Sequence, residues 1–198
     1  FRLDDGSLGR LGHRRRGQRT ASLGATDDGG GTYSVSIATK SSTCKSQNRK
    51  FRAPTAVFVP SREALAMYEG FTAAYLKREL AFDETYFDLA VALSAAGLRG
   101  SPPRAFVETV VDLETALGGK IVLQGQRFYV RAEGGSMLEA PLLSEGMRKL
   151  GSILRLLQNG ELRETGLLFW DEPEANLNPR LTVVVARALA RLAAHNVQ

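Results

Sequence analysis

The feature that most constrains the fold is a run of four apolar residues, Leu167–Trp170, that leads directly into Asp171, Glu172 and Pro173. A short continuous apolar run predicts a β-strand buried on both faces, as in a parallel sheet that is covered by helices. Such sheets bind their ligands beyond the carboxyl ends of the strands, which is where the two acids lie. The run therefore predicts an α/β fold with a functional site at Asp171 and Glu172.

Two neighbouring carboxylates at this strand end favour a metal-dependent reaction over a purely structural turn. Carboxylates beside a buried strand are costly unless a cation or a reaction uses them. Asp171 is suited to hold Mg²⁺ through water, because that ion keeps much of its hydration shell. Glu172 is suited to orient or deprotonate an attacking water. The alternative is an acidic turn before a helix that opens at Asn178-Pro179, but the apolar run and Pro173 favour the metal site.

The positive charge of the chain is concentrated in its N-terminal part. Residues 1–52 hold 11 of the 26 Lys and Arg residues but only 4 of the 21 Asp and Glu residues. Residues 53–198 hold 15 basic and 17 acidic residues, so the part that contains the apolar run is slightly acidic. Binding of nucleic acid through the basic residues 10–52 is therefore an alternative function of the N-terminal segment alone.

The N-terminal part also differs from the rest in composition. Residues 1–31 are rich in Gly and Arg and lack an apolar period, which predicts a poorly structured segment, and residues 40–52 are predicted to be a polar connector. The chain begins at Phe1, so we expect a fragment, and a shifted reading frame upstream of about residue 31 is a hypothesis. We therefore divide the chain into a poorly structured basic segment, 1–52, and a domain, 53–198.

The middle of the second domain is predicted to be helical. Apolar residues recur at helical spacing through about residues 61–118, and we interpret these stripes as core packing. Ser61 and Asp83 are predicted N-caps, with the first helix running through about residue 69. Ser101-Pro102 is a further helix start, since proline fits the first helical turn.

Two more elements precede the apolar run. Gly125-Gln126 separates two short apolar segments and predicts a β-hairpin over residues 120–132, because glycine in the first position suits a type II′ turn. Ser144 is the predicted N-cap of a helix over residues 144–158, with Leu150, Leu154 and other apolar residues on one side.

Residues 168–179 resemble the Walker B motif and D-loop of ABC-class ATPases. The sequence from Trp170 to Pro179 is especially similar to small prokaryotic AAA-family ATPases related to the SMC and OLD groups, which are often linked to toxin–antitoxin or phage-defence operons. The resemblance extends over residues 53–198. It implies a partial P-loop NTPase sheet of the ABC-ATPase type with an inserted helical lid at about residues 61–118. It also implies binding and hydrolysis of ATP, with Asp171 holding Mg²⁺ and Glu172 as the catalytic base.

The resemblance also implies further nucleotide contacts. Residues 143–147 lie where that class has its signature motif, at a helix N-terminus of the kind that binds phosphate. Ser144, Gly146 and the D-loop residue Asn178 would bind ATP held between two subunits. The second subunit would be a copy of the chain or a partner ATPase, and the operon link implies a partner protein from a defence or toxin–antitoxin operon. Glu145 departs from the signature motif and puts a negative charge near the γ-phosphate.

The sequence contains no Walker A loop of the form Gly-x-x-x-x-Gly-Lys-Ser/Thr. Without it there is no backbone cradle and no lysine for the phosphates. A following strand with a switch histidine is also missing, and His195 is expected to stabilise a helix end instead. We therefore expect a fragment that is inactive alone. The alternative is a non-catalytic module for partner binding or dimerisation, whereas an aspartate-dyad hydrolase with another metal has no histidine cluster behind it.

Composition also bears on localisation. No apolar run approaches the ~20 residues that a membrane-spanning helix needs, and no signal segment opens the chain. The single cysteine, Cys44, cannot form an internal disulfide and fits a reducing compartment. We expect a cytoplasmic protein without a membrane partner.

Overall fold

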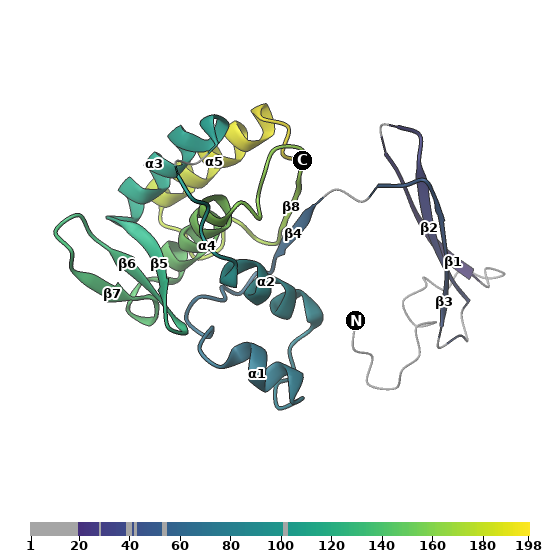
Figure 1. Ribbon diagram of the computed structural model, residues 1–198, viewed down its shortest axis with the longest axis horizontal. Coiled ribbons are helices and arrows are strands. Elements are labelled where there is room, and N and C mark those ends of the chain that lie inside the picture. Colours follow the sequence, from purple (N-terminus) through teal and green to yellow (C-terminus); the bar gives the residue numbers. More distant parts are fainter. Residues whose placement is uncertain (1–19, 28, 39–40, 42, 53–54, 101–102) are drawn as a thin grey trace. The chain divides into compact units, whose positions relative to one another are not determined.

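The computed structural model describes the whole chain except residues 1–19, 28, 39–40, 42, 53–54 and 101–102 (Figure 1). The chain divides into two compact units, Phe1–Ala53 and Pro54–Gln198. Among the described residues, no helix combines the length and the apolarity that crossing a membrane requires.

The smaller unit contains an antiparallel sheet in the order β1 (Thr20–Thr26), β2 (Thr32–Ala38) and β3 (Cys44–Arg49). The expectation of a poorly structured segment is therefore wrong for β1, and the expected polar connector is wrong for β3. Residues 1–19 lie outside the described part of the chain. All six residues of β3 are exposed, although the strand pairs along its length with β2. A strand of that kind has no apolar alternation by which sequence could reveal it.

The larger unit contains the apolar run as β8 (Leu167–Trp170), paired in parallel with β4 (Ala56–Val59). The predicted parallel strand is thus confirmed, but its burial on both faces is wrong. Val57 and Val59 are 5% and 2% exposed on the face that meets the core, whereas Phe58 and Phe169 are 41% and 54% exposed on the other. Side chains alternate along a strand, so only one set faces the covering helices.

The second edge of β8 is also hydrogen-bonded. The Leu168 amide donates to the Gln198 carbonyl at 2.7 Å, and the Gln198 amide donates to the Gly166 carbonyl at 3.0 Å. This reciprocal pattern is that of neighbouring parallel strands. β8 therefore lies between β4 and the backbone of Gln198.

The helix α4 (Glu145–Asn159) runs through the middle of the larger unit, with α3 (Val107–Leu117) and α5 (Pro179–Ala194) on one side and α2 (Glu84–Ser94) on the other (Figure 1). The predicted helix over residues 144–158 is confirmed. It is buried on almost every side rather than on one stripe. Its core includes Leu150, Leu154 and Leu157, all below 1% exposed.

Buried polar residues of α4 complete the C-terminal end of α2. Arg155 donates to the carbonyls of Leu93 at 3.0 Å and Ala95 at 2.6 Å, and Asn159 donates to the carbonyl of Ala92 at 2.8 Å. The last carbonyls of a helix have no partner within it. Desolvation lowers the pKa of the Arg155 guanidinium. Side chains of α4 therefore satisfy the carbonyls at the C-terminal end of α2. These polar side chains of α4 bind protein backbone rather than solvent.

The predicted helix from Ser61 to about residue 69 is wrong, since residues 61–70 form bends and turns. The Glu63 carboxylate accepts a hydrogen bond from the Ala66 amide at 3.1 Å, and such local bonds compete with a helix. The helix predicted at Asp83 is confirmed as α2, where Asp83 accepts from the Thr85 amide at 3.0 Å. The predicted start at Ser101-Pro102 lies outside the described residues.

The predicted hairpin is confirmed as β5 (Lys120–Gln124) and β6 (Arg127–Arg131), and Gly125 has the positive φ of 63° that its turn requires. A third strand, β7 (Met137–Glu139), pairs with β6 and was not predicted. A short helix, α1 (Phe71–Leu76), precedes α2, and 3₁₀ turns over Arg104–Phe106 and Ala140–Leu142 lead into α3 and α4.

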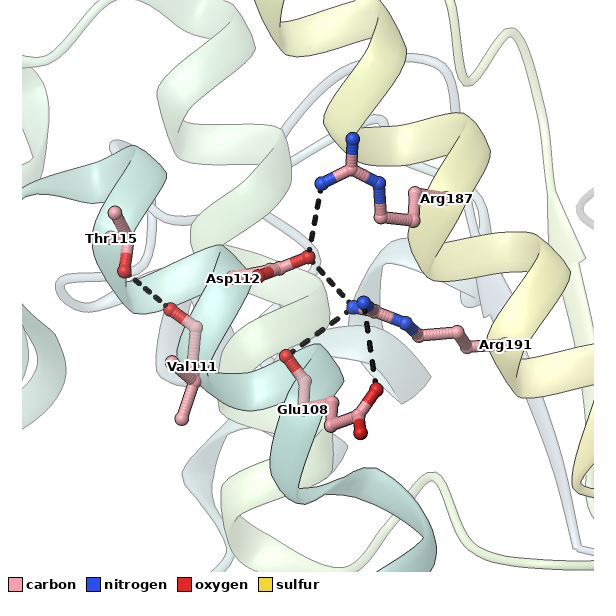
Figure 2. A network of polar contacts seen from close by, with 6 residues as sticks. All are labelled: Glu108, Val111, Asp112, Thr115, Arg187 and Arg191. Carbon is pink, nitrogen blue, oxygen red and sulfur yellow. Dashed lines mark hydrogen bonds and ion pairs between the residues drawn. The ribbon is translucent and has the colours of Figure 1, made fainter.

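A polar network joins α3 to α5 (Figure 2). Asp112 on α3 accepts hydrogen bonds from Arg191 at 2.7 Å and from Arg187 at 3.4 Å, both on α5. Arg191 also bonds the Glu108 carbonyl at 3.4 Å and lies 3.6 Å from the Glu108 carboxylate. One carboxylate thus bridges two guanidinium groups across the helix pair.

This network predicts a stability that depends on pH. The hydrogen bonds from Arg191 and Arg187 lower the pKa of Asp112. A carboxyl with a lowered pKa stabilises the folded chain at pH values above its pKa in the unfolded chain, about 3.9. This contribution is lost as the pH falls through the pKa of the folded chain. Asp112→Asn should therefore lower the free energy of unfolding near neutral pH by ~1 kcal/mol or less, as for other exposed pairs, and the difference should vanish in acid.

Urea unfolding followed by circular dichroism across this pH range measures the effect. Glu164→Gln is the matched control, because Glu164 is exposed and has no ion pair among the described residues. A difference between wild type and Asp112→Asn that is the same at every pH would contradict the assignment.

Candidate functional site

Residues 171–177, called here the β8 turn, connect β8 to α5 and carry both acids. The Asp171 amide donates to the Val59 carbonyl at 2.9 Å, so the turn begins at the carboxyl ends of both strands. Glu172 and Asn176 have φ values of 48° and 62°, in the left-handed region that residues other than glycine rarely adopt. The side chains of Asp171 and Glu172 are exposed. The cost that we expected from carboxylates beside a buried strand therefore does not arise.

The start of α4 supports the β8 turn at two points. Lys149 is 1% exposed, and its Nζ donates to the carbonyls of Glu172 at 3.0 Å and Ala175 at 3.1 Å. At Gly146 a Cβ would lie only 2.8 Å from the carbonyl oxygen of Asn176. The two segments therefore pack so closely that position 146 has no room for a side chain.

A polar depression of about 450 Å³ opens beside Glu172. It is formed by the loop after β4, the start of α4 and the β8 turn, and its lining residues are Ser61, Arg62, Glu63, Met67, Glu145, Arg148, Glu172 and Asn176. Because the loops that follow two parallel strands both contribute, this Glu172 depression lies where α/β sheets bind their ligands.

The two arginines of the depression differ in their contacts. Arg148 Nε lies 2.7 Å from Glu63 Oε1, with side chains 17% and 9% exposed, and Arg148 also donates to the Leu143 carbonyl. This ion pair ties the loop after β4 to α4. Arg62 is exposed and has neither a hydrogen bond nor an ion pair within the described part of the chain. Its guanidinium is thus available to an anion in the depression.

Two of the predicted nucleotide residues are helix caps. The Ser144 hydroxyl accepts from the Met147 amide at 3.4 Å at the start of α4. The Asn178 side-chain oxygen accepts from the Leu181 amide at 2.9 Å at the start of α5. Both residues are exposed, so their remaining polar atoms face solvent. Both residues cap helices as the sequence predicts. Their contact with a nucleotide stays a prediction.

Only one of the five predicted site residues lines the depression, namely Glu172. Asp171 precedes it on the same turn. Gly146 is buried under the turn, and Ser144 and Asn178 lie outside the lining. The structure thus brings Glu172 together with Arg62 and Glu145 rather than with the predicted Ser144.

Asp171 fits Mg²⁺ in the mode that this ion prefers. Within the described residues, no group of three His, Cys, Asp or Glu side chains is arranged to hold a metal. Mg²⁺ does not need such a cage, because it keeps several waters and binds through one or two carboxylates and the phosphates of a substrate. The Asp171 carboxylate is exposed and forms no ion pair among the described residues, so it is free for that role.

Sequence reasoning missed Arg62, Lys149 and the ion pair of Glu63 with Arg148. A signal existed for Lys149, since it lies four residues before the buried Ile153 and thus interrupts an apolar face of its helix. The ion pair joins segments that are distant in the chain and leaves no local pattern.

Comparison with known proteins identifies a family to which the chain is similar. The model of a family described as an AAA domain, putative AbiEii toxin, Type IV TA system, matches residues 34–198. No curated protein matches the chain. The matched residues include β2 from residue 34 onward, β3 and the whole of the larger unit.

The close packing of α4 on the β8 turn predicts that Gly146→Ala destabilises the larger unit. Alanine ordinarily stabilises a helix by about 1 kcal/mol relative to glycine. Here the new Cβ would overlap the Asn176 carbonyl, which moves only with the turn, so we expect a net loss of ~1–3 kcal/mol. Urea unfolding measures this loss.

Gly151→Ala is the matched control in the same helix. Its Cβ would lie 2.9 Å from the end of the Leu65 side chain, which can rotate away. The loss at Gly146 should therefore exceed the loss at Gly151. Equal stability of the two variants would contradict the close packing.

Proposed function

The chain belongs to the family of AAA domains described as a putative AbiEii toxin of type IV toxin–antitoxin systems, and we propose that it carries the hydrolytic half of an ABC-type ATP site. Membership of this family supports a P-loop ATPase type of function in general. The assignment of Walker B and D-loop roles to residues 168–179 is our own proposal.

The observation that carries the proposal is the position of Glu172. It follows a parallel strand, it is exposed, and it lines a polar depression together with Arg62, which has no hydrogen bond or ion pair among the described residues. A carboxylate beside a cationic group at the carboxyl end of a parallel sheet suits a reaction in which water attacks a phosphate.

Each residue then has a separate task. Asp171 would hold Mg²⁺, which would supply positive charge against the phosphates. Glu172 orients the attacking water and accepts its proton. Arg62 contacts phosphate oxygens from the side of the loop after β4.

Two of the remaining predicted residues, Ser144 and Asn178, are proposed to contact a second subunit. Ser144 and Asn178 cap α4 and α5 on exposed surfaces, where a nucleotide held by a copy of the chain or by a partner ATPase could meet them. Gly146 lets α4 approach the β8 turn and acts in nucleotide binding through that packing. A partner protein from a defence or toxin–antitoxin operon fits the family description.

We also propose a lid that is narrower than residues 61–118. Phe71 of α1 and Tyr86 of α2 form a small cluster with Phe82 that is separate from the main core. By contrast, α3 packs into the main core through Leu113 and Leu117. The lid is therefore confined to α1 and the first half of α2.

The proposal predicts distinct effects for the two acids. Residues 1–198 contain no Walker A loop and should neither bind ATP tightly nor hydrolyse it. In a longer protein that joins this chain to a P-loop, Glu172→Gln should lower turnover ~10²–10⁴-fold while ATP stays bound. Asp171→Asn should weaken the dependence of hydrolysis on Mg²⁺ concentration. Phosphate release and retention of radiolabelled ATP measure both effects.

Glu174→Gln is the matched control, because Glu174 is an exposed acid on the same turn that does not line the depression. It should behave as wild type. Normal hydrolysis by Glu172→Gln would refute the role of the base, and hydrolysis by residues 1–198 alone that Glu172→Gln abolishes would refute the need for a P-loop.

A further inference from the structure

Lys149 is a buried lysine whose ammonium, among the described residues, donates hydrogen bonds to the β8 turn alone. Its side chain is 1% exposed, and Nζ donates to the carbonyls of Glu172 at 3.0 Å and Ala175 at 3.1 Å. Within the described residues it forms no ion pair with a carboxylate. The ammonium therefore acts on the backbone of the turn and not on an acidic side chain.

Burial of a lysine without a carboxylate partner is costly, and a hydrocarbon side chain would fill the same place more cheaply. Core packing therefore does not explain a lysine at this position. The two carbonyls that it binds belong to the residue proposed as the base and to a residue three positions further along the same turn. The positive charge is thus used at the proposed catalytic segment.

The turn needs such support because its backbone is strained. Glu172 and Asn176 both adopt the left-handed region, with φ of 48° and 62°. Such a backbone conformation is unfavourable for a residue other than glycine, less so for asparagine, and it persists where the surroundings enforce it. At Glu172 the hydrogen bond from the Lys149 ammonium holds the left-handed conformation in place. At Asn176 the close approach of Gly146 does so.

We propose that Lys149 is a positioning residue for Glu172, an inference that rests on the proposed function of Glu172 as the base. The ammonium fixes the Glu172 carbonyl and so sets the left-handed backbone that directs the carboxylate toward the depression. Since Lys149 lies in the second turn of α4, it also couples the helix that starts at Ser144 to the hydrolytic carboxylate.

The first test uses residues 1–198 as they are and needs no ATP. Lys149→Met keeps an unbranched side chain that is one atom shorter and removes its hydrogen-bond donors. Hydrogen–deuterium exchange should become at least about tenfold faster at the amides of Asp171, Ala175 and Leu177, which are bonded within or to the β8 turn. Exchange in the hairpin of β5 and β6 should change little. Equal acceleration in the hairpin and the turn would overturn the inference.

Two further variants keep the test decisive. Ser152→Ala is the control, because Ser152 is a buried polar residue of α4 whose hydroxyl, within the described part of the chain, donates only to the Arg148 carbonyl of the same helix, at 3.2 Å. It should leave exchange in the turn unchanged. Lys149→Gln retains amide donors, so it should give an intermediate acceleration and serves where Lys149→Met does not fold.

The second test uses a longer protein that joins this chain to a P-loop. Lys149→Met should lower kcat ~10–100-fold and leave KM for ATP unchanged, since the variant displaces the base and not the phosphate contacts. If exchange in the turn is faster in Lys149→Met but the wild-type longer protein does not hydrolyse ATP, the proposed function is refuted. The finding that Lys149 holds the turn would still stand. Hydrolysis that depends on Glu172 but has an unchanged kcat in Lys149→Met would refute the positioning role alone.

Discussion

The larger unit depends on the packing of the β8 turn against the start of α4. The apolar strand can end in two exposed acids only because the chain turns sharply after it, and that turn places Glu172 and Asn176 in the left-handed region. Lys149 binds two of its carbonyls, and Gly146 leaves space for a third. A strained loop on a rigid helix keeps a carboxylate in one place, which is what catalysis by positioned groups requires.

The same helix organises the rest of the fold. Its apolar residues fill the core between α2, α3 and α5, and its polar residues Arg155 and Asn159 complete the end of α2. Arg148 ties it to the loop after β4. A shift of α4 would therefore reach the β8 turn, the Glu172 depression and the proposed lid together. This shared support gives a physical basis for coupling between the proposed nucleotide contacts and the proposed lid.

Sequence predicted what depends on local pattern. Four apolar residues identified β8, Gly125 identified the hairpin turn, and Ser144, Asp83 and Asn178 identified three helix starts. The sequence did not predict features that depend on contacts between segments distant in the chain. One face of β8 is open, β3 has no apolar alternation, and residues 61–70 follow a side-chain bond of Glu63 instead of a helix. The roles of Lys149 and Arg62 depend on contacts across the fold, so a single sequence carries at most a weak signal of them.

The central claim is that the carboxyl end of β8 is the metal-binding, hydrolytic end of an ATP site. The most direct measurement replaces Mg²⁺ with Mn²⁺ in a longer protein that joins this chain to a P-loop and records electron paramagnetic resonance with ATP present. We expect a bound Mn²⁺ signal in wild type and in Glu174→Gln that is weakened or altered in Asp171→Asn. An identical signal in Asp171→Asn would contradict it, because the metal would then lie elsewhere.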